Sequence, residues 1–224
     1  MARQPGIARF ETDGVRGFLH TPNDSANLGM VLTHGAGSDC SSPLLVKVAE
    51  AFCSAGVTVL RCDLPFRQQR PSGPPQPGKS AADRAGLKLA IATVSDLVGG
   101  SVFLAGHSYG GRQASLLAAE EPGLALGLLL LSYPLHPPKK PEQLRVQHFP
   151  QLRTPSVFVH GTADPFGSIA ELKSAIAAIP AATQLITVEA ARHDLGGARF
   201  DPTESVAAVL SGLTGRPKKI NSSR

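Results

Sequence analysis

The sequence predicts a single-domain α/β fold, in which helices cover both faces of a mostly parallel central sheet. Short aliphatic and β-branched segments alternate with amphipathic helical segments along nearly the whole chain of 224 residues. The segment LGLLLLSY at 126–133 has no polar alternation, which is typical of a strand in the middle of a sheet covered on both sides. We see no internal repeat, and we expect one domain over residues 1–213 and a flexible basic tail over 214–224.

The first expected elements are an antiparallel pair of strands over 7–20 and a strand at 28–34. Pro43 opens the next helix and Gly56 ends it, because proline suits the first helical turn and glycine suits the position after the last turn. The later strands are expected at 57–63, 101–105, 126–133, 155–161 and 183–189. The later helices are expected at 80–97, from the end of the segment GHSYGG to 120, at 168–179 and at 202–213.

Five prolines fall within residues 64–79, LPFRQQRPSGPPQPGK. Because proline interrupts both helices and sheets, this segment is expected to be a long irregular loop. It follows a strand that ends at the carboxyl edge of the sheet, where open α/β sheets bind their ligands. Arg67 and Arg70 therefore suggest a border of the site that favours anionic substrates, with a solvated basic loop as the alternative.

Composition argues against several other classes of protein. The longest apolar run, at 124–135, is broken by Pro134, and no signal peptide is recognisable, so we expect a cytoplasmic protein without a membrane span. The net charge of +5 comes from scattered basic residues, which argues against nucleic-acid binding. Three cysteines without C-x-x-C spacing predict neither a disulfide framework nor a zinc site. We expect no metal and no organic cofactor, and the sequence leaves the oligomeric state open.

The segment GHSYGG at 106–111 contains the pattern G-x-S-x-G, with Ser108 in its middle. The pattern alone is weak, but here an apolar strand precedes it and an Ala- and Leu-rich helix follows at once. This context is that of a nucleophile elbow, a sharp strand-to-helix turn that presents a reactive serine. Such a turn requires Gly106 and Gly110, since side chains there would collide with the strand and the helix that the turn joins.

A serine nucleophile needs a histidine base and an acid that orients the base. Asp164 and His193 follow Ser108 in the chain order that this kind of turn requires, each in the loop after a predicted strand. Asp164 also fits a plain Asp-Pro turn, and His193 also fits a surface loop. Asp194 is the rival for the acid, but we expect it to cap the turn that follows it.

The oxyanion that forms during acyl transfer needs two backbone N–H donors. Tyr109 supplies one because it follows the nucleophile, and the loop HGAG after an early strand supplies the other. Ala36 is the best donor in that loop, with Gly35 as the fallback. His34 and His160 precede glycines at strand ends and are expected to orient loops.

The segments THGAG, GHSYGG, SYPLHPPKKPEQLR, VFVHGTADPFG and RHDL together resemble the α/β-hydrolase superfamily over about residues 28–212. They are most similar to a small branch related to dienelactone hydrolases, the KAN-like or testis-expressed-protein-like predicted hydrolases. Dienelactone hydrolases use a cysteine nucleophile, so their substrate does not carry over to a serine. The resemblance implies a catalytic triad of Ser108, Asp164 and His193, and an oxyanion hole formed by Ala36 and Tyr109.

The connection after the strand at 126–133 spans only about residues 134–153, which is too short for a multi-helix cap. An open site favours small or polar esters over long acyl chains. We therefore predict an α/β-hydrolase fold without a cap domain, and a serine hydrolase that acts on carboxylic esters. A non-catalytic scaffold and an acyltransferase with the same triad stay open as alternatives. Arg112, just after the elbow, is expected to pair with a neighbouring loop.

Overall fold

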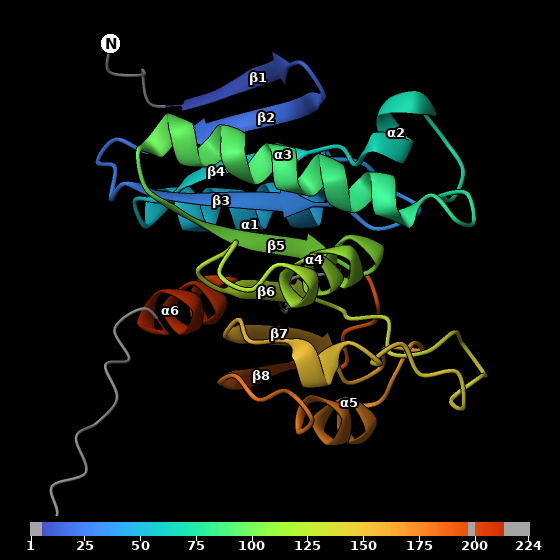
Figure 1. The fold of residues 1–224 in the computed structure, drawn as a ribbon. Coiled ribbons are helices and arrows are strands. Elements are labelled where there is room, and N and C mark those ends of the chain that lie inside the picture. Colours follow the sequence, from blue (N-terminus) through green and yellow to red (C-terminus); the bar gives the residue numbers. More distant parts are fainter. Residues whose placement is uncertain (1–5, 197–199, 213–224) are drawn as a thin grey trace, which may run out of the picture.

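Eight strands form one sheet in residues 6–196 and 200–212, the part of the chain that the computed structural model describes (Figure 1). The strands are β1 (Gly6–Thr12), β2 (Val15–Thr21), β3 (Leu28–Thr33), β4 (Thr58–Cys62), β5 (Ser101–His107), β6 (Leu128–Leu131), β7 (Ser156–Gly161) and β8 (Thr183–Val188). The helices are α1 (Pro43–Ser54), α2 (Pro65–Gln69), α3 (Ser80–Val98), α4 (Tyr109–Glu120), α5 (Ile169–Ile176) and α6 (Thr203–Ser211), with a 3-10 helix, η1 (Phe149–Gln151).

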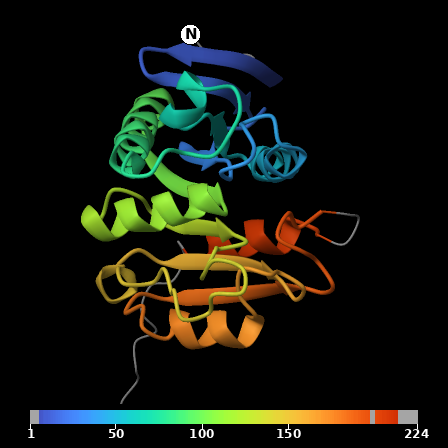
Figure 2. The same cartoon turned by 90° about the vertical axis from the view of Figure 1, so that its right-hand side faces the viewer.

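The strands lie in the order β1-β2-β4-β3-β5-β6-β7-β8. β2 pairs antiparallel with β1 and β4, and all the other neighbouring pairs of these strands are parallel, so the predicted mostly parallel sheet is confirmed. Parallel strands end at the same edge of a sheet, and the loops that follow β3, β5, β7 and β8 therefore meet. This carboxyl edge faces the viewer in Figure 2.

Two aliphatic cores flank the sheet. α3, α4 and α5 pack on one face and bury side chains such as Leu117, whereas α1 and α6 pack on the other and bury side chains such as Phe52. Leu104 and Ala105 of β5 belong to opposite cores, because successive side chains of a strand point to opposite faces. Figure 2 shows α3 and α4 on one side of the sheet and α1 and α6 on the other.

The prediction that residues 64–79 lack regular structure is wrong at their start, where α2 forms. Pro65 occupies the first helical turn, in which a backbone N–H has no partner within the helix. The Asp83 carboxylate on α3 accepts the N–H of Phe66 at 3.1 Å, which fixes this turn from outside the segment. The four other prolines all follow Gln69 and leave the turn undisturbed.

The connection between β6 and β7 carries η1 and, within the described ranges, no cap domain. Its Tyr133 and Phe149 are buried, and the N–H of Arg145 donates to the Leu135 carbonyl at 2.8 Å. α2 and this connection flank the carboxyl edge (Figure 2). None of the helices in the described ranges is long and apolar enough to cross a membrane. The predicted tail at 214–224 lies outside the described residues.

Candidate active site

Ser108 lies at the turn between β5 and α4 in a backbone conformation that serine rarely adopts, with φ 50° and ψ −115°. Two hydrogen bonds fix the turn. The N–H of Ser108 donates to the Leu131 carbonyl at 2.8 Å, and its carbonyl accepts the N–H of Arg112 at 2.9 Å. The hydroxyl is therefore presented by a rigid turn at the carboxyl edge of the sheet.

Two glycines allow β5 and α4 to approach as closely as this turn requires. A Cβ on Gly106 would lie 2.6 Å from the Gly110 carbonyl carbon. A Cβ on Gly110 would lie 2.5 Å from the His34 carbonyl oxygen and 2.7 Å from Thr33 Cγ2. These distances are shorter than van der Waals contact, so the predicted collisions are confirmed.

His193 follows β8 and joins Ser108 to Asp164. Its Nε2 lies 2.7 Å from Ser108 Oγ, and its Nδ1 lies 2.8 Å from Asp164 Oδ2. A carboxylate only accepts, so Nδ1 carries the proton and Nε2 accepts from the serine hydroxyl. Asp194 instead accepts the N–H of Gly196 at 3.0 Å and caps its own turn. The structure brings Ser108, His193 and Asp164 together and leaves Asp194 outside this arrangement.

The surroundings of Asp164 keep it ionised. Burial by itself raises the pKa of this carboxyl, but the hydrogen bond from His193 and the N–H of Phe166, at 2.9 Å, outweigh burial and lower the pKa below its ordinary value. The Phe166 ring also lies against the His193 imidazole, with 4.1 Å between centroids. His160 Nε2 donates to the Gly167 carbonyl at 2.8 Å and orients this loop.

The backbone N–H groups of Ala36 and Tyr109 lie on two segments that meet at Ser108. A Cβ on Gly35 would lie only 3.4 Å from Ser108 Cβ, so the loop after β3 approaches the elbow closely. No residue of the described ranges accepts a hydrogen bond from either N–H, and both are available to a developing oxyanion. His34 orients this loop, since its Nδ1 donates to the Gly35 carbonyl at 2.8 Å.

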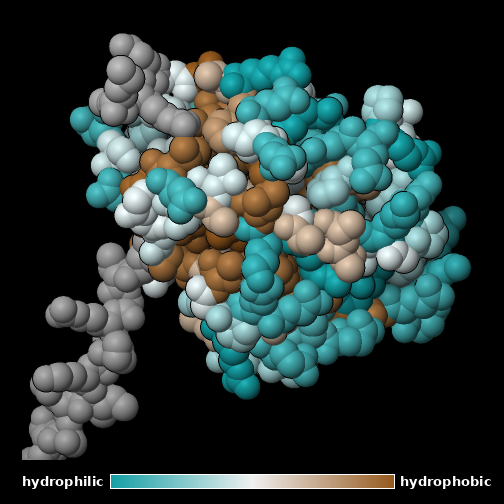
Figure 3. Space-filling view, turned by 45° about the horizontal axis from the view of Figure 1, so that its top comes forward, coloured by the Kyte–Doolittle hydropathy of each residue, from teal (hydrophilic) through white to brown (hydrophobic). Residues whose placement is uncertain are grey.

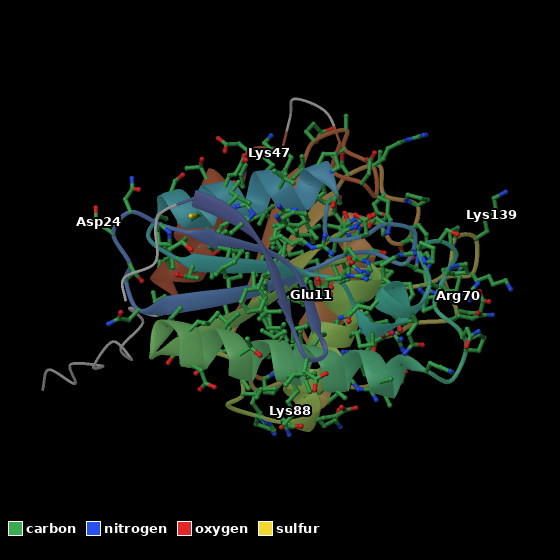
Figure 4. All side chains as sticks on the ribbon, turned by 90° about the horizontal axis from the view of Figure 1, so that it is seen from above. Glu11, Asp24, Lys47, Arg70, Lys88 and Lys139 are labelled. Carbon is green, nitrogen blue, oxygen red and sulfur yellow. The ribbon has the colours of Figure 1, made fainter. Side chains whose placement is uncertain are left out.

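Arg67 holds the same loop from the other side. Its side chain is buried, and all its hydrogen bonds go to backbone carbonyl groups. The acceptors are the carbonyl oxygens of Ala36 and Ser38, both at 2.9 Å, Gly73 at 3.1 Å and Arg70 at 3.2 Å. The guanidinium therefore joins α2 and the proline-rich segment to the loop that carries Ala36. Arg70 itself is exposed and points outward at this end of the molecule (Figure 4).

A model of the α/β hydrolase domain family matches residues 26–210. The chain belongs to this α/β hydrolase family. Its fold is similar to that of a dienelactone hydrolase from Anabaena variabilis, with 22% identity, a TM-score of 0.68 and coverage of 93% of this chain and 95% of that chain. TT1662 from Thermus thermophilus is 18% identical with a TM-score of 0.74, over 96% of this chain and 100% of that chain. XC6422 from Xanthomonas campestris, described as a serine hydrolase without lid, is 14% identical with a TM-score of 0.70, over 96% of this chain and 95% of that chain.

In this α/β hydrolase, the end of the molecule that carries α2 is mostly hydrophilic, whereas hydrophobic residues gather nearer the opposite end (Figure 3). A groove on the side of His193 is lined by His107, Ala163, Pro165, Arg192, His193 and Asp194. In the portion of the chain that the structure describes, no group of three or more His, Cys, Asp and Glu side chains is placed to hold a metal ion.

Three contacts of this site were not predicted. Tyr109 Oη donates to Asp83 Oδ2 at 2.7 Å, and the Tyr109 ring packs edge-on against Phe66, with 5.7 Å between centroids. His107 Nε2 donates to the backbone carbonyl of His193 at 2.8 Å. His107 had a local signal because it occupies the variable position before the serine in G-x-S-x-G. Asp83 had none, since it lies inside an ordinary helical pattern.

Proposed function

We propose that this α/β hydrolase is a serine esterase that hydrolyses carboxylic esters of small or polar molecules through a covalent acyl-enzyme. The observation that carries the proposal is the unbroken path of hydrogen bonds from Ser108 through His193 to Asp164, with contacts of 2.7 and 2.8 Å. A dienelactone hydrolase and a serine hydrolase without lid among the similar structures support the same class of reaction. The unbroken path disfavours a non-catalytic scaffold.

Acylation follows from the positions of these atoms. Ser108 Oγ bonds to the ester carbonyl carbon while His193 Nε2 takes the hydroxyl proton. The carbonyl electron pair moves onto oxygen, where the N–H groups of Ala36 and Tyr109 stabilise the negative charge. The bond to the alcohol oxygen then breaks, and His193 returns its proton to that leaving oxygen. Asp164 stabilises the transient imidazolium and holds its Nδ1 proton.

Deacylation repeats the same transfers with water. His193 Nε2 takes a proton from a water molecule as its oxygen attacks the acyl carbon. The same two N–H groups stabilise the second oxyanion. When the bond to Ser108 Oγ breaks, His193 gives the proton back to the serine, and the carboxylic acid leaves. Neither step requires a charged side chain other than the His193 imidazolium and the Asp164 carboxylate.

The short connection after β6 supports a preference for small or polar esters, because no multi-helix lid encloses the elbow in the part of the chain that the structure describes. The segment SYPLHPP within that connection supports membership of the KAN-like or testis-expressed-protein-like branch. The cytoplasmic location stays a prediction from the sequence.

A fluorophosphonate probe tests the proposal directly, because it phosphonylates only an activated serine. We expect labelling at Ser108 in the wild-type protein and none in Ser108→Ala. With 4-nitrophenyl acetate, Ser108→Ala and His193→Ala should each lose roughly 10³-fold or more in kcat. Asp194→Asn is the matched control and should keep its activity. Near-normal turnover by Ser108→Ala would remove the basis of the proposal.

A further inference from the structure

Arg112 lies on α4 and Arg145 lies in the connection between β6 and β7, and these two segments touch. Within residues 6–196 and 200–212, no ion pair joins either guanidinium to a carboxylate. Arg112 Nε is also buried without a hydrogen-bond partner in those ranges, so the predicted pairing of Arg112 with a neighbouring loop is not found there. Buried donors are nearly always satisfied, so a donor without a protein partner calls for a partner outside the protein, such as water, an ion or a ligand.

Arg112 lies close to the nucleophile. It follows Ser108 by one helical turn, and its N–H donates to the Ser108 carbonyl at 2.9 Å. Side chains of an α-helix tilt toward the helix N-terminus, and the turn of Ser108 forms that end of α4.

Arg145 is connected to the other side of the site. Its N–H donates to the carbonyl of Leu135. His136, which follows Leu135, donates its N–H to the Phe166 carbonyl at 3.1 Å, and the Phe166 ring packs on His193. The loop of Arg145 therefore reaches the residues that surround the catalytic histidine.

The two arginines come from different segments and lie near each other. Ser115 Oγ donates to the Arg112 carbonyl at 2.9 Å and lies 2.8 Å from His148 Nε2. α4 therefore touches the connection between β6 and β7, which carries both His148 and Arg145. Burial and the nearby charge of Arg112 lower the pKa of Arg145 and bring the pKa of His148 to about 4. The positive charges of Arg112 and Arg145 therefore act on each other across the contact between α4 and the connection of β6 to β7.

Three other arginines near this edge, Arg61, Arg67 and Arg84, have partners of their own, whereas Arg192 lines the groove beside His193 and is exposed. Arg61 donates to the His20 ring at 2.7 Å, and Arg84 pairs with Glu120 at 2.9 Å. Arg67 is occupied by four carbonyl groups. The proline-rich segment thus offers mainly the exposed Arg70. Among these arginines, only Arg112 has a buried guanidinium nitrogen without a hydrogen-bond partner in the described ranges.

We propose that Arg112 and Arg145 form a subsite for an oxyanion group, a carboxylate or a phosphate, carried by the ester that Ser108 attacks. This inference rests on the proposed function and adds a substrate class to it. Guanidinium groups bind carboxylates and phosphates through two parallel N–H···O bonds. Two such groups from different segments would orient the ester against the serine as well as neutralise its charge.

The test compares two 4-nitrophenyl esters of equal acyl length, the hemiglutarate, which ends in a carboxylate, and the valerate, which is uncharged. We expect the wild-type protein to have the higher kcat/KM for the hemiglutarate. Arg112→Gln and Arg145→Gln should each lower the ratio of the two kcat/KM values roughly 10- to 100-fold, mainly through KM of the anionic ester. Competition by glutarate and by inorganic phosphate then distinguishes a carboxylate subsite from a phosphate subsite.

Two exposed cations at the same end of the molecule provide controls (Figure 4). Lys139→Asn removes one charge, and asparagine tolerates the φ of 62° at this position. Arg70→Gln removes a charge from the proline-rich segment. Both variants should keep the wild-type ratio. If Arg70→Gln lowers the ratio and the two proposed positions do not, the anion binds elsewhere and the inference is overturned.

Binding to Ser108→Ala separates this inference from the esterase proposal. Glutarate or phosphate should raise the Tm of Ser108→Ala, and the shift should disappear when Arg112→Gln and Arg145→Gln are added. A wild-type protein that hydrolyses both esters equally contradicts the subsite and leaves the esterase intact. A protein that binds glutarate through the two arginines but turns over neither ester supports the subsite and contradicts the esterase.

Discussion

The imidazole of His107 donates from Nε2 to the backbone carbonyl oxygen of His193 at 2.8 Å, and the two rings lie 5.4 Å apart. The residue before the proposed nucleophile, Ser108, thus holds the loop that carries the proposed base, His193. Burial lowers the pKa of His107 to about 4, so this imidazole is neutral at physiological pH. In the proposed mechanism, a neutral donor fixes the loop without placing a second positive charge beside the imidazolium of His193.

The first prediction concerns this contact. His107→Leu should lower kcat roughly 10-fold and leave KM nearly unchanged, because the His193 imidazole is then held less firmly toward Ser108. His107→Gln, which keeps an N–H donor, should recover part of the loss. The rate of fluorophosphonate labelling measures the same effect without a substrate. Unchanged labelling of His107→Leu, with an unchanged Tm, would assign the contact no part in positioning the base.

Arg67 carries the second prediction. Its side chain is 4% exposed and binds four carbonyl groups, one of them on Ala36. Arg67→Gln should lower the free energy of unfolding by roughly 1–3 kcal/mol, because buried carbonyl groups lose their donor. It should also lower kcat, since the loop of Ala36 is no longer held. Urea unfolding and ester turnover measure the two effects, with Arg70→Gln as the exposed control. If Arg67→Gln loses stability but keeps the full kcat, Arg67 is not needed to hold the loop of Ala36 for turnover.

The elbow glycine supplies the third prediction. Gly110→Ala should destabilise the fold by about 1–3 kcal/mol, because its Cβ would meet the His34 carbonyl oxygen at 2.5 Å and neither backbone can yield freely. Gly37→Ala is the matched control, since a Cβ there meets nothing within 4 Å. Thermal unfolding of both variants measures the difference. Equal Tm values would show that the strand and the helix have room to separate.

The sequence predicts well those features that depend on short segments. The strand before Ser108 and the helix after it are local patterns, and the chain order of Asp164 and His193 follows from the topology that those patterns imply. α2 was not predicted because the five prolines of residues 64–79 disfavour a helix. Pro65, however, suits a first helical turn, and residues 66–69 contain no proline. The N-cap contact to that turn comes from Asp83, 17 residues away, and no local pattern reveals it.

The arginines illustrate the same limit. The positions of Arg67, Arg70 and Arg112 relative to the predicted strand ends place them near a site. The sequence does not reveal which of their guanidinium groups bind backbone carbonyl groups. Arg67 donates to carbonyl groups of the loop after β3 and of the proline-rich segment, which only the folded chain brings together. Arg112 was expected to have a partner and has none for its Nε in the described ranges. Partners of long side chains depend on tertiary contacts, which periodicity and composition do not encode.

The last prediction concerns acid stability. Burial lowers the pKa of His20, His107 and His148 to about 4 each. In the unfolded chain these histidines titrate near 6.5, so between pH 6.5 and 4 the unfolded state binds more protons than the folded state. Stability is therefore fully present above pH 6.5 and declines as the pH falls, by at most about 1.4 kcal/mol per pH unit for each histidine.

Urea unfolding at pH 7.5, 6.5 and 5.5 measures this decline, and pH 5.5 is high enough that most carboxyl groups stay ionised in both states. The slope of the free energy of unfolding against pH gives the number of extra protons that the unfolded state binds. Below pH 6.5, His148→Gln should lower this number by up to one, because glutamine keeps a donor for Ser115 but does not titrate. Gln147→Asn, an equally small change at the exposed neighbour, should leave the slope as in the wild type. A free energy of unfolding that stays constant from pH 7.5 to 5.5 would mean that these imidazoles gain protons in the folded state as readily as in water, and that burial does not hold them neutral.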